Sequence, residues 1–166
     1  VLVCLILKTS AAAKVYIDIN APSATRVPII IAPFQKSGTG ADLHRLSTGM
    51  AKIISDDLDF SSLFRIIDPS LLKETYLQGV TRDEIKWDTL SVVGAEFIVT
   101  GKLQVSNNRI IAELRLFDAV QGRRIMGKRY NSTLGEHRLI SHRFANAIFN
   151  ELTGARGRFE TGIIFV

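Results

Sequence analysis

The chain has 166 residues, of which 46% are hydrophobic and 22% are charged, and its formal net charge is +5 at pH 7. This composition is that of a globular domain with its own core, and it excludes a disordered chain. The positive charge makes a nucleic-acid-binding module one alternative, but basic and acidic residues are mixed along the chain, as on an ordinary solvated surface. Because Cys4 is the single cysteine, an internal disulfide is also excluded.

The first thirteen residues have the pattern of an export signal that begins inside its apolar part. Residues 1–7 are continuously apolar, and Ala11 to Ala13 supply the small residues of a cleavage site. This apolar run is far shorter than the roughly 20 residues that span a bilayer. We therefore expect residues 1–13 to be a truncated signal peptide and the exported protein to begin at Lys14.

Residues 14–20 alternate between apolar and polar side chains, which predicts a short strand. One side of it would carry Val15, Ile17 and Ile19, and the other side would carry Tyr16, Asp18 and Asn20. Residues 21–26 have the composition of a linker, so this strand is tethered to the rest of the chain. It either adds an edge to the domain's own sheet or pairs with the sheet edge of a partner.

An apolar run bounded by prolines, Pro28 to Phe34, predicts a buried strand. The glycine-containing residues 35–40 follow as a loop, and residues 43–58 then carry apolar side chains at helical spacing. A strand, a glycine loop and a helix can together bind phosphate. Leu43, however, stands where the dinucleotide fingerprint needs glycine, and no Gly-Lys-Ser/Thr follows, so we expect no phosphate site in this loop.

The next stretch predicts a strand at Leu63 to Ile67 and a brief helix over residues 70–77. Thr81 and Glu84 have the spacing of a capping box, which predicts a further helix that ends at Gly94 in a left-handed conformation. Trp87 in this helix is expected to anchor a core or a groove.

Three strands at residues 97–105, 109–118 and 124–131 form the centre of the predicted fold. Their alternation predicts one apolar face, against which all the helices would pack, and one solvated face. The third strand is weakly apolar and carries Lys128 and Arg129, as an edge strand that must not recruit another chain would.

A second capping box at Thr133 and Glu136 opens a long helix that ends at Gly154, and residues 159–166 begin another strand. The predicted class is therefore α/β, in an α+β-like form. Its mixed sheet has about five strands, including the three-strand meander near the C-terminus, and is covered by two to three helices.

No catalytic, cofactor or metal site emerges from the sequence. His137 and His142 are five residues apart, so they do not share a helix face as metal ligands, and Asp56, Asp57 and Asp59 simply end an amphipathic helix. A nucleic-acid face on the meander would draw on Arg109, Arg115, Arg123, Arg124, Lys128 and Arg129. It would also need exposed aromatic residues for stacking, and Phe117 and Tyr130 are few for that task.

Residues 141–166 resemble the junction of the TolB family of periplasmic proteins, where an A-H-x-x-A-D helix leads to L-T-G-x-x-G-x-F-x-T-x-I-x-[FY]-V. Pro28 to Phe34 resembles that family's first core strand, and Leu90 to Gly101 resembles its L-G-A-D-x-[VI]-[VL]-x-G segment. The departures from the family pattern are Ser141 for Ala, Asn146 for Asp, and Gly162 where a basic residue is common. They concern surface or junction detail.

The resemblance implies an N-terminal α/β domain followed by a six-bladed β-propeller, which this chain would lack apart from its opening strand. The expected divisions are residues 1–13 as signal peptide, 14–26 as partner-binding strand and linker, 27–154 as the α/β domain, and 155–166 as the junction and first propeller strand.

The resemblance also implies a function. TolB proteins are non-enzymatic adaptors in the periplasm of Gram-negative bacteria, where they link TolA with Pal in the Tol–Pal system during cell-envelope constriction at division. Pal docks on the propeller, so no Pal-binding residue is assigned here, and no cofactor, nucleic acid or small-molecule substrate is expected. TolA docks on the N-terminus of the exported chain, which assigns partner binding to Lys14, Val15, Tyr16, Ile17, Asp18, Ile19 and Asn20.

Overall fold

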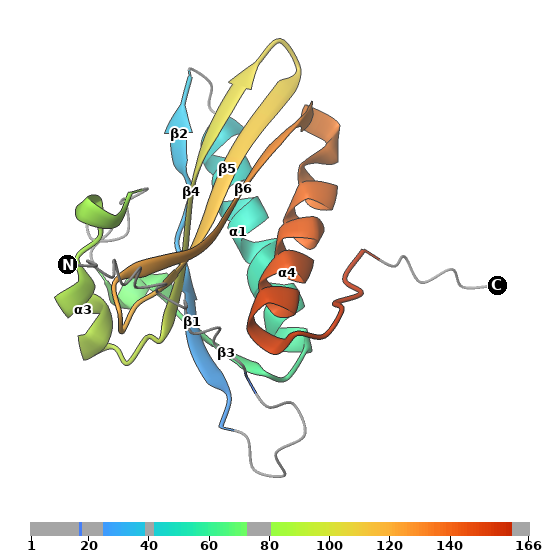
Figure 1. Cartoon of the computed structure of the whole chain (residues 1–166). Coiled ribbons are helices and arrows are strands. Elements are labelled where there is room, and N and C mark those ends of the chain that lie inside the picture. The colour runs from blue at the N-terminus through green and yellow to red at the C-terminus, as the bar shows by residue number, and fades with distance from the viewer. Residues whose placement is uncertain (1–16, 18–24, 39–41, 73–80, 161–166) are drawn as a thin grey trace, which may run out of the picture.

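Six strands form one mixed sheet in the computed structural model, which describes residues 17, 25–38, 42–72 and 81–160 (Figure 1). They are β1 (Val27–Ile31), β2 (Gln35–Ser37), β3 (Phe64–Ile67), β4 (Phe97–Ser106), β5 (Arg109–Asp118) and β6 (Arg123–Thr133). The order is β3-β1-β4-β5-β6, with β2 also paired to β4. Strands β1 and β2 run parallel to their neighbours, whereas β4, β5 and β6 form the predicted antiparallel meander with β6 at the edge.

Two long helices cover one face of this sheet, and a short helix lies on the other face (Figure 1). The long helices are α1 (Asp42–Phe60) and α4 (His137–Thr153), and the short one is α3 (Trp87–Val92). Single 3-10 turns lie at Pro69–Leu71, Arg82–Glu84 and Leu134–Glu136. The predicted mixed α/β class is confirmed, and no helix in the described ranges is long and apolar enough to cross a membrane.

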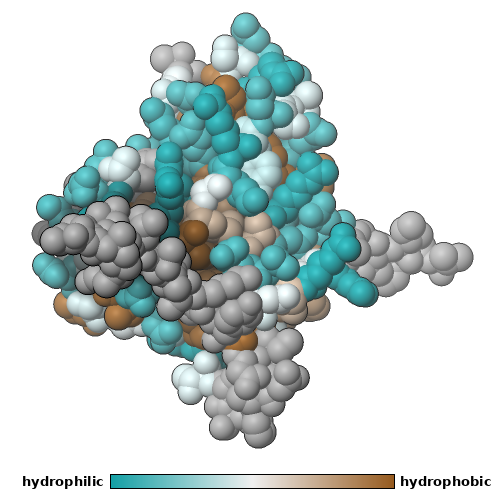
Figure 2. All heavy atoms as spheres, in the orientation of Figure 1, coloured by the Kyte–Doolittle hydropathy of each residue, from teal (hydrophilic) through white to brown (hydrophobic). Residues whose placement is uncertain are grey.

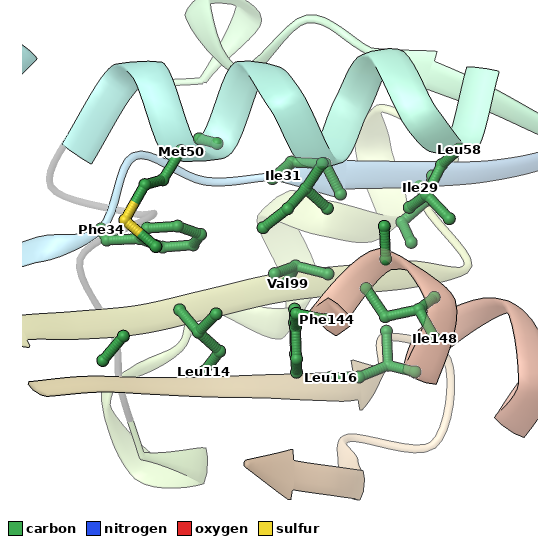
Figure 3. Packing of buried hydrophobic residues seen from close by; sticks show 14 of the residues in the cluster. Ile29, Ile31, Phe34, Met50, Leu58, Val99, Leu114, Leu116, Phe144 and Ile148 are labelled. Carbon is green, nitrogen blue, oxygen red and sulfur yellow. The ribbon is translucent and has the colours of Figure 1, made fainter. Parts of the chain in front are cut away.

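The larger buried cluster lies between the sheet and the two long helices (Figure 3). Met50 of α1 meets Phe34, and Phe144 and Ile148 of α4 point toward Val99 of β4 and the β5 strand. The side chains of Phe34, Met50 and Phe144 are at most 1% exposed. The apolar side chains at helical spacing in both helices therefore pack against the predicted apolar face of the meander.

A second buried cluster shows that the expectation of one apolar and one solvated face is wrong at the end of the sheet that α3 covers. Ile30, Ile98 and Phe117 lie on the face opposite α1 and α4, and they pack with Ile85 and with Leu90 of α3. The helix near Ile85 thus covers the face that we expected to be solvated. The physical reason is that β1 lies inside the sheet between two parallel neighbours, and such strands are buried on both faces.

Several local predictions differ from the structure in detail. The capping box is present, with the Thr81 N–H donating to Glu84 Oε2 at 3.0 Å, but it closes only a 3-10 turn because Ile85 is extended and α3 begins later. Residues 35–37, expected in a loop, form β2 instead. The predicted brief helix starts as a 3-10 turn, and residues 73–80 lie outside the described part of the chain. Gly94 and Gly154 have the predicted positive φ.

Tyr130 on β6 gives the domain a predicted sensitivity to alkali. Burial raises the pKa of its phenol from 10.0 to about 12, with a smaller lowering effect from Arg143 and a raising effect from Glu160. The folded state therefore favours the neutral phenol, so this contribution to stability is complete below pH 10 and is lost as the pH rises through about 12. We expect urea unfolding to show that wild type loses stability relative to Tyr130→Phe between pH 9.5 and 12, and a constant difference would contradict this.

Candidate functional site

Ile17 is the one residue of the predicted partner-binding segment that the structure describes; Lys14 to Tyr16 and Asp18 to Asn20, predicted for the same role, lie outside the described residues. Its backbone N–H donates to the carbonyl oxygen of Leu152 at 2.8 Å. Its side chain is partly buried against the larger core cluster. One apolar position of the segment is thus held at the C-terminal end of α4.

The end of α4 offers this contact because a helix leaves its last carbonyls without partners inside the helix. Gly154 turns the chain with a φ of 72°, and its N–H donates to the carbonyl of Asn150, which leaves the Leu152 carbonyl available to Ile17. Leu152 itself is fully buried. The helix end therefore acts as an acceptor for the N-terminal segment.

The residues that follow α4 fold back along the same helix. Asn146 accepts a hydrogen bond from the N–H of Phe159 at 2.9 Å and donates one to Glu160 Oε1 at 3.1 Å. The Phe159 ring packs edge-on against Phe149 at 5.8 Å, and Arg143 Nε donates to Glu160 at 3.3 Å. Asn146, one of the departures from the family pattern, thus makes contacts that hold the start of the junction.

A histidine–carboxylate contact joins the two long helices. The Nδ1 atom of His142 on α4 lies 2.7 Å from Oδ2 of Asp57 on α1. Burial raises the pKa of the Asp57 carboxyl, and the hydrogen bond and charge of His142 oppose that rise. His142 is therefore a packed residue, and its partner 85 positions away was not visible in the sequence. Among the described residues, no group of three potential metal ligands comes together.

The six basic residues of the meander do not all lie on one face of the sheet. Strand register places Arg109, Arg115, Arg124 and Arg129 on the face away from α1 and α4, whereas Lys128 lies opposite Leu114 on the helix side. Neither aromatic residue considered for stacking is available on this face: Phe117 lies on it but is 1% exposed beside Trp87, and Tyr130 packs against the larger core cluster on the other face. The aromatic platform that single-stranded nucleic acids need is thus absent from the described part of this face.

Comparisons with known proteins agree with this fold. The family model of the TolB amino-terminal domain matches residues 15–125. The Tol-Pal system protein TolB of Desulfosudis oleivorans is 33% identical over 91% of this chain, and that of Syntrophus aciditrophicus is 31% identical over 92%. These alignments cover 35% and 34% of the two relatives, so the chain spans about a third of their length.

Among solved structures, the crystal structure of TolB from Acinetobacter baumannii superposes with a TM-score of 0.61 over 80% of this chain and 30% of that chain. The sequence identity in this superposition is 20%, so this likeness concerns the fold alone. The family match covers most of the chain and includes β1, α1 and β4 as well as all but one residue of the predicted partner-binding segment. The chain therefore belongs to the TolB amino-terminal domain family.

Proposed function

We propose that this chain is the N-terminal domain of a non-enzymatic periplasmic adaptor of the Tol–Pal envelope system and that it binds TolA through residues 14–20. The observation that carries the proposal is the family match, which begins at Val15 inside that segment. The alternating pattern of the same residues supports it, because alternation suits a strand that pairs with another sheet.

The proposed mechanism is strand addition. The backbone of residues 14–20 would pair with an exposed sheet edge of TolA and supply affinity, while the side chains on alternate positions select the partner. Val15, Ile17 and Ile19 are the proposed anchors on one side. Tyr16, Asp18 and Asn20 would face the other side, toward solvent or the partner's rim.

Ile17 has to change partners for this mechanism to operate. Its N–H is engaged by the Leu152 carbonyl, and its side chain packs against the domain's own core. Pairing of the same groups with TolA requires that Ile17 leave the end of α4. The affinity for TolA is then reduced by the free energy of that release.

The rest of the proposed organisation follows the family pattern. Residues 1–13 would direct export, residues 27–154 would form the α/β domain, and residues 155–166 would lead into a propeller that carries the Pal contact. The adaptor would thereby contribute to envelope integrity and to outer-membrane constriction at division. The nucleic-acid alternative has lost its main structural support, since Phe117 and Tyr130 do not lie exposed on the basic face.

An experiment on alternate positions tests the strand mechanism. We expect the double variant Val15→Ser, Ile19→Ser to weaken binding to the C-terminal domain of TolA at least tenfold. A tenfold loss corresponds to about the free energy of burying one aliphatic side chain. The matched control, Tyr16→Ser with Asp18→Ser, should change the Kd less than about threefold. Ile17 is left intact because it also contacts its own domain. Equal losses in the two variants, measured by calorimetry, would contradict the proposed alternation.

A further inference from the structure

A hollow of about 320 Å³ lies on the face of β5 and β6 that α1 and α4 leave uncovered. Gly127 lies at its floor, and its rim includes Arg115, Arg124, Arg129 and Glu113. On this face, α3 packs near Phe117, the cross-strand neighbour of Arg124, so the hollow lies next to α3. The molecular surface in Figure 2 is largely hydrophilic over the upper end of the sheet and along α4.

Gly127 is not required by the backbone or by close packing. Its φ is outside the left-handed region, and a Cβ atom built there would meet Arg115 Cγ at 3.7 Å and Arg124 Cδ at 4.0 Å, which are ordinary contacts. Gly101 on β4 is different, because a Cβ there would lie 2.8 Å from the backbone oxygen of Glu113. A strand glycine often marks either a bulge or the close approach of a ligand, and a register shift does lie nearby, between Leu116 and Phe117.

Three guanidinium groups and one carboxylate surround this glycine. Glu113 accepts from Arg115 Nη2 at 3.2 Å and lies 3.6 Å from Arg129 Nη1, so it holds two arginines in place. Arg124 makes no ion pair with any residue in the described ranges. Lys128 also lines the hollow, so four basic residues and one glutamate give a local formal charge of +3.

Arg115, which lines the hollow, and its cross-strand neighbour Thr100 each have one polar atom without a partner among the described residues. Arg115 Nη1 and Thr100 Oγ1 are both buried, and neither has a hydrogen-bond partner within the part of the chain that the structure describes. Thr100 and Arg115 are direct cross-strand neighbours, and Arg115 is the neighbour of Gly127, so the three residues form one row across β4, β5 and β6. Unsatisfied buried polar atoms are rare, so Arg115 has a donor to spare beside the hollow that it lines.

We propose that this hollow binds a phosphate group, with Arg115, Arg124 and Arg129 as its ligands and Gly127 as its open floor. Guanidinium groups bind phosphate oxygens in pairs, and the excess of positive charge around the hollow complements a phosphate anion. A tetrahedral group presents oxygens to donors that arrive from several directions, whereas a carboxylate presents two oxygens in one plane. The site is distinct from residues 14–20 and does not depend on the TolA proposal.

The test is an NMR titration of the full chain with inorganic phosphate at constant ionic strength. We expect saturable shifts at the amides of Arg115, Arg124 and Gly127. Arg124→Gln should weaken the affinity about tenfold through loss of a charge-assisted contact, and Gly127→Ala should weaken it similarly by filling the floor. The control is Arg109→Gln, which makes the same charge change on the same strand face, but at a residue already bonded to Asn131 at 2.7 Å.

The outcomes distinguish a specific phosphate site from general electrostatic attraction of phosphate to a basic protein. Loss of affinity in Arg124→Gln and Gly127→Ala with little change in Arg109→Gln supports the proposal. Equal weakening by both arginine variants, unchanged affinity in Gly127→Ala, or binding of acetate as tight as that of phosphate would overturn it. Sedimentation with phosphatidylglycerol vesicles distinguishes two sources of the phosphate group. Weaker vesicle binding by Gly127→Ala supports a lipid headgroup as the ligand. Vesicle binding that does not depend on Gly127 supports a soluble phosphate compound.

Discussion

Phe144→Ala is expected to lower the free energy of unfolding by about 3–5 kcal/mol, as for other fully buried phenylalanines. The Phe144 ring is 0% exposed and lies between α4 and the meander, where it packs near Val99 and Ile148 (Figure 3). Truncation removes the apolar contacts of the ring and leaves a cavity that the strands of a paired sheet cannot readily collapse to fill. Urea unfolding followed by circular dichroism measures the loss.

The matched control for this change is Phe60→Ala. Phe60 ends α1 with 85% of its surface exposed, so the same truncation removes little buried area and should change stability by less than about 0.5 kcal/mol. If the two variants lose similar amounts of stability, α4 does not pack on the sheet as described. That result would also undermine the position of Leu152, and with it the contact to Ile17.

Gly101→Ala is expected to cost about 1–3 kcal/mol through overpacking. A Cβ atom at Gly101 would lie 2.6 Å from Leu114 Cδ2, 2.8 Å from the Glu113 backbone oxygen and 3.1 Å from Phe34 Cδ1. The leucine could turn away, but the backbone oxygen is fixed by the β4–β5 pairing. The sheet must therefore separate locally, and the loss should be visible in the midpoint of urea unfolding.

Gly127→Ala is the control for this second prediction because it makes the same substitution in the same sheet. Its added methyl group would meet only ordinary contacts at 3.7 Å or more, so its stability should match or slightly exceed that of wild type. A loss in Gly127→Ala as large as that in Gly101→Ala would contradict both the packing at Gly101 and the open floor of the proposed phosphate site.

The strands of the meander were predictable because the side chains of the first two largely alternate between apolar and polar. The predicted 109–118 strand matches β5, and β4 and β6 differ by one or two residues at their ends. The left-handed Gly154 was also predictable, since a helical pattern stops there. These features depend on local sequence, and local sequence was sufficient to identify them.

The remaining errors arise where distant segments meet. The position of α3 depends on the pairing of β1 with β3 and β4, which creates a second buried face that the meander alone does not have. Similarly, β2 has the composition of a loop and is a strand only because β4 offers it an edge. Periodicity reports one segment at a time, so it carries no information about such pairings.

The candidate site was accessible from the sequence only through the family resemblance. Alternation predicted a strand at residues 14–20, but nothing in those residues indicated that Ile17 would meet the end of α4. Gly127 lies inside the predicted 124–131 strand, and its relation to Arg115 and Arg124 needed the register of β5 and β6. The roles of Lys14 to Asn20 in partner binding stay predictions.

One measurement tests the adaptor proposal most directly: binding of the C-terminal domain of TolA to chains that start at Lys14 and at Arg26. We predict that the longer chain binds and that the shorter chain loses at least about a hundredfold in affinity, because the entire pairing strand is removed. Thermal unfolding of the shorter chain checks that its domain remains folded without the contact between Ile17 and Leu152. Equal affinity of the two folded chains would contradict the proposal.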